Sequence, residues 1–215
     1  MLQQNAEAMP LPRLSAGLEP GPNPAFYPGM TQELPGMGQE LDDMIQRSRH
    51  PRLLTLDFLT VCSARIRRAY TYWDAKRAGR AMPARSDINP SEIPDLLPYI
   101  VLTDVLNEPP YLRYRLVGTR QVQMRGIDPT GKPVAGNHIG RHLAVDTTNE
   151  VLLNYWIVIG KRSFVYDNNK FLGPALDVGS LDIGQLHERG TLLLPLSSDG
   201  TNVDMVFCII DVDPA

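Results

Sequence analysis

Residues 100–117 read IVLTDVLNEPPYLRYRLV, which is two apolar runs separated by the Pro-Pro pair at 109–110. Both runs are rich in Val, Ile, Leu and Tyr, and β-branched and aromatic residues favour strands. Proline cannot continue a central strand, so the pair marks the end of the first run. We therefore predict an antiparallel hairpin made of strands 100–106 and 111–117.

The alternation of the second strand predicts which of its side chains enter the core. Successive residues of a strand point to opposite faces of the sheet. One face carries Leu112, Tyr114 and Leu116, and the other carries Arg113, Arg115 and Val117. We expect the first face, which has no charged residue, to lie against the core.

The C-terminal part of the chain predicts three more strands. Residues 163–166 form a short apolar run, and longer runs follow at 190–196 and 203–212. The last two are joined through Asp199-Gly200, a pair typical of tight hairpins because both residues tolerate positive φ. We expect 203–212 to be a central strand, because it is apolar on both faces.

Helices are predicted between the two groups of strands. Residues 119–126 and 149–161 have apolar side chains at helical spacing. The chain is therefore expected to be an α+β protein with a five-stranded antiparallel sheet and crossover helices on one face.

The N-terminal part of the chain predicts a tail followed by a long helix. Residues 9–38 contain seven prolines and five glycines, so we expect residues 1–52 to be disordered. Residues 53–82 are predicted as a basic amphipathic helical segment and 83–215 as the folded domain. The helix itself, of about 23 residues from Thr55 to Gly79, would span about 35 Å. The apolar face of this helix is formed by Phe58, Cys62, Ile66, Ala69 and Trp73.

This helix has two interpretations that the sequence leaves open. Its length favours a dimerisation or signalling helix, but it can equally lie across its own sheet. Ten basic and two acidic residues fall between positions 47 and 85, a net charge of +8, against −11 for the rest of the chain. The basic face, with Arg65, Arg68 and Arg77, therefore predicts either an acidic partner or a contact with the acidic remainder of the chain.

Composition excludes several classes of protein. No apolar run is long enough for a membrane-spanning helix, and the first 30 residues lack the pattern of a signal peptide. Cys62 and Cys208 are the only cysteines, which excludes a disulfide framework and a four-cysteine zinc site. We expect a cytoplasmic protein, and a net charge of −3 argues against a general nucleic-acid binder.

Five motifs, in this order, resemble the short bacterial proteins built around a single divergent PAS domain. The resemblance covers about residues 55–212 and implies signal sensing or protein interaction. The motifs are Trp73, Pro83 with Arg85 to Pro90, Arg115 to Thr119, Asp128 to Gly131, and Leu194 to Gly200.

Signatures of enzymes and cofactors are missing from the sequence. There is no phosphate loop, nucleophile elbow, kinase motif or cyclase motif. His138 and His142 are four residues apart, but the surrounding glycines argue against a helix that would aim both at a metal. The resemblance implies that a haem-binding domain would have a histidine in 149–161, and this segment has none. It also implies that a flavin photoreceptor would have a reactive cysteine in the first crossover helices, and none is present there. We expect no cofactor, no metal and no catalytic residue.

A ligand pocket between the sheet and the crossover helices is the remaining candidate site, and a filled core is its alternative. Its predicted walls are Tyr114, Leu116, Met124, Tyr155, Trp156 and Tyr166.

The predicted function is a non-enzymatic sensory or adaptor protein. It would bind a small ligand or a protein partner and signal through a homodimer or through a separate effector protein. The dimer or partner helix would use Phe58, Cys62, Ile66, Trp73, Arg65, Arg68 and Arg77.

Two alternatives stay open. One is a small α+β enzyme or ligand carrier that uses Asp104 or Asp177 beside His187. The other is an electrostatic binder of nucleic acid or anionic membrane through the basic helix, with nucleic acid disfavoured because few aromatic residues interleave the charges.

Overall fold

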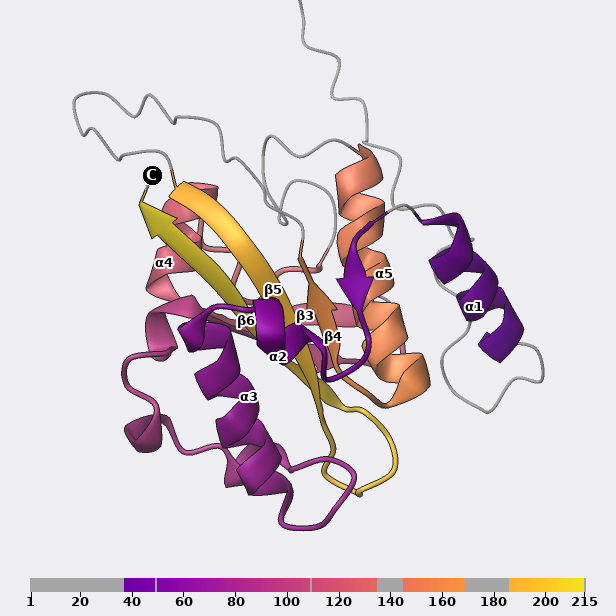
Figure 1. Cartoon of the computed structure of the whole chain (residues 1–215), viewed down its shortest axis with the longest axis horizontal. Helices are drawn as coiled ribbons and strands as arrows, with labels where there is room; N and C mark the ends of the chain where they lie inside the picture. Colours follow the sequence, from indigo (N-terminus) through magenta and orange to yellow (C-terminus); the bar gives the residue numbers. More distant parts are fainter. Residues whose placement is uncertain (1–36, 49, 109, 135–144, 169–185, 215) are drawn as a thin grey trace, which may run out of the picture.

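The computed structural model describes residues 37–48, 50–108, 110–134, 145–168 and 186–214. A single antiparallel sheet of six strands runs through them (Figure 1). In spatial order its strands are β1 (Arg52–Leu53), β4 (Val165–Asp167), β5 (Leu186–Leu196), β6 (Met205–Pro214), β2 (Ile100–Val105) and β3 (Leu112–Val117). The chain is therefore an α+β protein, as predicted.

The sheet has one strand more than predicted. The additional strand is β1, in which Arg52 pairs with Asp167 and Leu53 pairs with Tyr166 of β4. A strand of two residues is too short to show alternation, so the sequence contains no signal for it. The other five strands lie close to their predicted positions, and the hairpin of β2 and β3 is present.

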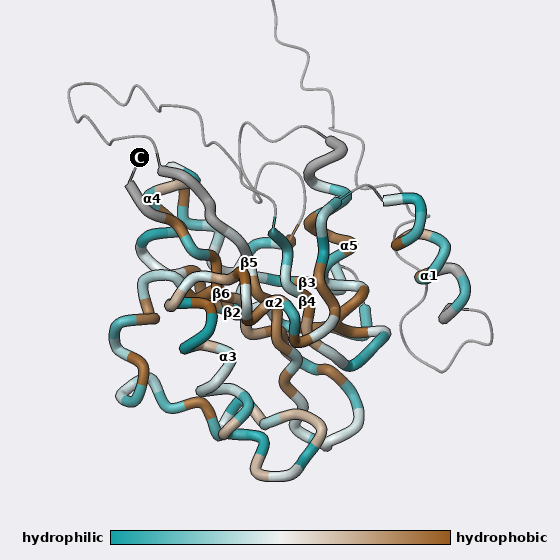
Figure 2. Tube along the Cα trace, in the orientation of Figure 1, coloured by the Kyte–Doolittle hydropathy of each residue, from teal (hydrophilic) through white to brown (hydrophobic). Residues whose placement is uncertain are grey.

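Helices cover both faces of the sheet (Figure 1). One face packs against α5 (Val145–Lys161) and α4 (Thr119–Arg125), the predicted crossover helices. The other face packs against α2 (Phe58–Val61) and α3 (Ala64–Arg77). Figure 2 shows the apolar residues concentrated on the strands at the centre, with polar residues outside them.

The prediction that Leu116 faces the core with Tyr114 is wrong, because β3 contains a bulge. Leu102 pairs with Leu116, but the next residue of β2, Thr103, pairs with Tyr114. The extra residue, Arg115, reverses the alternation after it. Leu116 consequently falls on the α3 face, where its side chain is 43% exposed, and Val117 enters the core under α5.

The predicted single helix over 53–82 is also wrong, since the chain forms two helices with a break between them. Cys62 is extended, with ψ of 160°, and the Ser63 hydroxyl accepts a hydrogen bond from Ile66 N at 3.2 Å. Ser63 has an extended backbone, as an N-cap residue requires, and an extended residue cannot continue a helix. Helix α2 therefore ends before Ser63, which begins α3. Helix α3 ends at Ala78, whose φ is 47°.

The apolar face predicted for this region is buried against the chain's own sheet. Phe58 and Ile66 have no exposed surface, and Trp73 donates a hydrogen bond from Nε1 to the Pro195 carbonyl at 2.9 Å. These side chains belong to the same cluster as Leu194 and Phe207. They therefore form part of the monomer's core.

The predicted disordered tail of 1–52 contains a helix, α1 (Met37–Arg47), besides strand β1. Residues 1–36 lie outside the described residues. Leu41 is buried against α5, and Asp42 forms an ion pair with Lys161 at 2.6 Å. Packing against α5 stabilises a helix that its own sequence would leave marginal.

Three 3₁₀ turns connect α3 to the sheet. They are η2 (Arg85–Asp87), η3 (Pro90–Glu92) and η4 (Leu97–Tyr99). Each begins close to a proline or a capping side chain, and Asn89 caps η3 by accepting a hydrogen bond from Ser91 N. Turn η3 lies beside α3, where Lys76 forms an ion pair with Glu92, and η4 packs against α4.

Candidate functional site

Polar side chains lie inside the layer between the sheet and the crossover helices. They come from four elements: Thr103 from β2, Tyr114 from β3, Gln121 and Arg125 from α4, and Tyr155 from α5. All five residues are buried, and Thr103 and Gln121 have no exposed surface. Buried polar groups in an otherwise apolar layer need hydrogen-bond partners to offset the loss of water.

The position of α4 depends on the glycine that precedes it. A β-carbon at Gly118 would lie 2.4 Å from the carbonyl oxygen of Pro98, so no other residue fits at this position. Gly118 N also donates to the Ile100 carbonyl at 2.8 Å. The start of α4 is thereby held against η4 and the first residue of β2, which directs Gln121 and Arg125 into the interior.

Arg125 and the two tyrosines make the central contacts of this interior group. Arg125 Nη1 donates to the Tyr114 hydroxyl at 3.0 Å, and its guanidinium carbon is 5.2 Å from the centre of the Tyr114 ring. The Tyr155 hydroxyl lies 3.2 Å from Thr103 Oγ1. Burial raises the pKa of Tyr155 well above its usual value, so this phenol stays protonated and able to donate.

Gln121 provides an acceptor that the described residues leave unused. Its Nε2 donates to the Ile210 carbonyl at 3.2 Å. Its Oε1 is buried and accepts no hydrogen bond within the part of the chain that the structure describes. A buried acceptor without a donor is costly, typically by about 1–3 kcal/mol.

The structure brings together four of the six residues predicted to line a pocket. Met124, Tyr155 and Trp156 pack in the same cluster as Tyr114. Leu116 does not belong to it, because of the bulge in β3. Tyr166 lies on the opposite face of the sheet, where its ring stacks on that of Phe58 with centroids 5.3 Å apart.

Sequence reasoning missed Thr103, Gln121 and Arg125. Thr103 could have been found, because it alternates with Val101 on the face that turns out to lie under α5. Arg125 lies in the last turn of α4, where a basic side chain ordinarily lies in solvent and interacts favourably with the helix dipole. The sequence therefore contains no signal that Arg125 is buried.

A second polar group joins the N-terminal segment to the middle of α5, and we call it the N-terminal latch. It consists of His50, Arg52, Glu150, Asn154 and Asp167. Asp167 Oδ2 accepts hydrogen bonds from Asn154 Nδ2 at 2.7 Å and from His50 Nε2 at 2.8 Å. Arg52 pairs with Glu150 at 2.6 Å and donates to Asn154 Oδ1. The Arg52 side chain is only 4% exposed.

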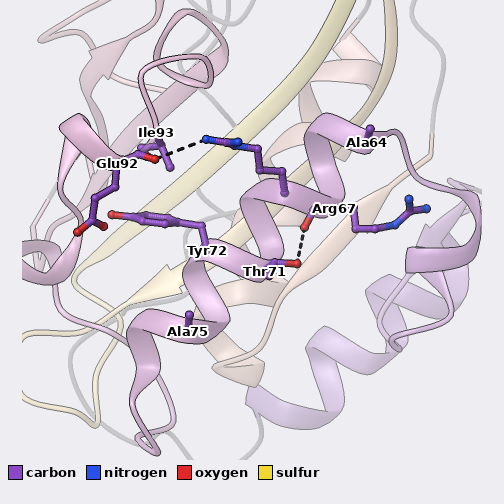
Figure 3. A pocket seen from close by; sticks show the side chains of 8 residues that line it. Ala64, Arg67, Thr71, Tyr72, Ala75, Glu92 and Ile93 are labelled. Carbon is purple, nitrogen blue, oxygen red and sulfur yellow. Dashed lines mark hydrogen bonds between the residues drawn. The ribbon is translucent and has the colours of Figure 1, made fainter.

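The third feature is a hollow on the surface of α3, with a volume of about 520 Å³ (Figure 3). It lies between the outer face of α3 and the turn η3. Ile93 and Glu92 form one wall, and Tyr72 points across the hollow toward Glu92. The walls from α3 are Ala64, Arg67, Arg68, Thr71, Tyr72 and Ala75.

Most basic residues of the predicted basic face are paired within the chain. Arg65 pairs with Asp211 and lies over the ring of Tyr99 at 3.8 Å. Further ion pairs join Arg68 to Asp95, Lys76 to Glu92, Arg77 to Asp74, and Arg80 to Asp87. Four of these five pairs join the basic stretch to acidic residues outside it, as expected if it contacts the acidic remainder of the chain, whereas Asp74 lies within the stretch.

The residues of the alternative functions are placed as follows. Asp104 is buried and accepts hydrogen bonds from Arg113 at 3.0 Å and Arg115 at 2.9 Å. His138, His142 and Asp177 lie outside the described residues, as does the side chain of His187.

Among the described side chains, no three potential metal ligands come together. None of the described helices has the length and apolarity to cross a membrane.

The fold is that of an α+β domain in which a helical crossover joins an antiparallel hairpin to three further strands of the same sheet. Residues 61–141 match the family model for a PAS domain. No curated protein and no solved structure matches the chain. The match supports the resemblance found in the sequence and places the similarity to a PAS domain in residues 61–141. PAS domains are, in general, sensory and signalling modules.

Proposed function

We propose that this protein is a non-enzymatic PAS sensory protein that receives a small molecule in the interior under α4 and α5. The observation that supports this best is the group of buried polar side chains in that layer. A core built only for stability would place apolar residues at Thr103, Gln121 and Arg125, because a buried polar side chain needs hydrogen bonds to offset its loss of water.

The side chains of this layer define the chemistry of the ligand. Tyr114, Tyr155 and Trp156 offer aromatic surface, and Arg125 and Tyr155 offer hydrogen-bond donors. A molecule with an apolar or aromatic body and at least one acceptor group, such as a carbonyl or carboxylate, fits this combination.

Helix α5 connects this interior to the N-terminal segment. Tyr155 and Trp156 face the interior, and Asn154 and Glu150 on the same helix belong to the N-terminal latch. A ligand that shifts α5 would therefore change the hydrogen bonds that hold Arg52 and His50. The output would be a change in the N-terminal segment, read by an effector protein.

Native mass spectrometry of freshly purified protein tests the proposal. We expect a mass above that of the denatured chain, from a co-purified small molecule. Arg125→Gln should lose this additional mass, and the control Arg120→Gln should keep it, because Arg120 hydrogen-bonds to Gln123 on the exposed side of the same helix. Equal native and denatured masses for the wild-type protein would contradict the proposal, as would an additional mass that survives Arg125→Gln in a folded protein.

A further inference from the structure

We propose that Gln121 makes the interior site selective for a cyclic aromatic amide, whose N–H group donates to Gln121 while its carbonyl group accepts from Arg125. The inference deepens the proposed function and rests on it, because it requires that the interior holds a small molecule. It starts from Gln121 Oε1, a buried acceptor to which no described residue donates a hydrogen bond.

The orientation of the Gln121 amide is fixed by its nitrogen. Gln121 Nε2 donates to the Ile210 carbonyl of β6 at 3.2 Å. Turning the amide over would place Oε1 against that carbonyl, and two acceptors cannot form a hydrogen bond. Gln121 has no exposed surface, so Oε1 cannot turn to bulk water instead. The oxygen therefore needs a donor supplied inside the domain.

Arg125 places hydrogen-bond donors beside this acceptor. It lies four residues after Gln121 on α4, so the two side chains leave the same face of the helix with about 5–6 Å between their β-carbons. Both residues are buried. A guanidinium group has five N–H donors and no acceptor, and Arg125 gives one of them to the Tyr114 hydroxyl at 3.0 Å. Arg125 can therefore serve a ligand acceptor in addition to Tyr114.

Together the two side chains offer an acceptor next to a donor. An amide carries the complementary pair, an N–H donor next to a carbonyl acceptor, and a cyclic amide holds both on one edge of its ring. A single ligand edge can then satisfy Gln121 and Arg125 at once. The aromatic surface of Tyr114, Tyr155 and Trp156 suits a flat ring behind this edge.

Charged ligand groups match this pair of side chains less well. A carboxylate suits Arg125 but has no proton for Gln121 Oε1. An ammonium group has protons to donate, but it would lie beside the positive charge of Arg125. The five buried polar residues of this layer include no acid that would offset that repulsion: Thr103, Tyr114, Gln121, Arg125 and Tyr155.

An ordered water molecule is the alternative donor to Gln121. Water would satisfy Oε1 without any N–H group on the ligand. The two cases differ in selectivity. A site that relies on the ligand for the donor rejects an analogue without it, because the buried acceptor then loses its partner.

Calorimetric titration of the full chain, dialysed to remove any co-purified molecule, tests the inference with three bicyclic aromatic probes. Carbostyril has an N–H group and a carbonyl group on one edge. Coumarin has the same size and shape, with a ring oxygen in place of the N–H group, and naphthoate has a carboxylate. We expect carbostyril to bind about tenfold or more tightly than either of the others.

Two variants assign the preference to Gln121. Gln121→Met removes the acceptor and should bind carbostyril and coumarin equally. The control Gln123→Met should keep the wild-type preference, because Gln123 is exposed on the other side of α4 and bonds to Arg120. The comparison of probes on the wild-type protein stands without the variants, so it remains decisive if Gln121→Met does not fold.

Equal affinity of the wild-type protein for carbostyril and coumarin would overturn the inference and indicate water at Oε1. Tighter binding of naphthoate, or no binding of carbostyril, would also overturn it, as would a folded Gln121→Met that keeps the preference. A co-purified small molecule without a preference for carbostyril would contradict only the role of Gln121. The absence of a co-purified molecule, together with no binding of any probe, would contradict the proposed function as well.

Discussion

Leu41 of α1 lies so close to Gly160 of α5 that a β-carbon on Gly160 would be 2.8 Å from Leu41 Cδ2. Because Gly160 has no side chain, α1 can pack closely against α5. Asp42 and Lys161 add an ion pair beside this contact. The contact joins the N-terminal segment to the helix that also lines the interior.

Enlarging position 160 should release α1. Gly160→Leu would place a branched side chain where Leu41 now packs, and we expect proteases to cleave within residues 37–47 much faster than in the wild-type protein. The double variant L41A/G160L places the large side chain on α5 and the small one on α1. It should restore much of the resistance of residues 37–47 to proteolysis. Equal cleavage of Gly160→Leu and wild type would show that α1 does not depend on this contact.

The N-terminal latch should contribute strongly to stability. Arg52→Met leaves Glu150 and Asn154 without their buried partner, and we expect the free energy of unfolding to fall by about 3 kcal/mol. Urea denaturation measures this loss. Arg113→Met is the control, since the Arg113 side chain is 41% exposed and its pair with Asp104 should contribute about 1 kcal/mol or less. Equal losses in the two variants would contradict the prediction.

A methyl group at position 190 should strain β5. Gly190 has φ of 139°, and a β-carbon there would lie 2.6 Å from the Tyr166 hydroxyl. We expect Gly190→Ala to lower the free energy of unfolding by about 1–3 kcal/mol. Gly200→Ala is the control. Gly200 also has a positive φ, but no atom lies within 4 Å of a β-carbon built there. This variant therefore measures the backbone strain without the contact with Tyr166. A smaller loss in Gly190→Ala than in Gly200→Ala would argue against the contact with Tyr166.

The hairpin between β5 and β6 should make stability depend on pH through Asp199. The backbone N–H groups of Asn202 and Thr201 donate to its carboxylate and hold the pKa of Asp199 well below its usual value. A lowered pKa in the folded state means that the stabilisation is present at neutral pH and is lost as the pH falls below about 4. We expect wild type and Asp199→Asn to differ in stability at neutral pH and to converge in strong acid. A difference that stays constant with pH would exclude this role of Asp199.

Part of the candidate site could be predicted from the sequence. Tyr114, Tyr155, Trp156 and Met124 pack in one cluster, and the sequence could indicate this because strand alternation and helical spacing are local properties. The predicted face of Leu116 is wrong because the bulge adds one residue, Arg115, to β3. No local sequence pattern indicates this bulge. Arg125 was missed because its burial depends on α4 being held against η4 through Gly118.

The amino-acid sequence by itself determined the five longer strands and the crossover helices, since propensity and periodicity act over a few neighbouring residues. The resemblance to a PAS domain could also be found in its motifs. Only the tertiary structure decided which faces meet. It turned Leu116 outward, covered the apolar face of α3 with the sheet, and paired arginines with acids distant in the chain, such as Arg65 with Asp211. These outcomes depend on register and on long-range packing, in which a shift of one residue exchanges the two faces of a strand.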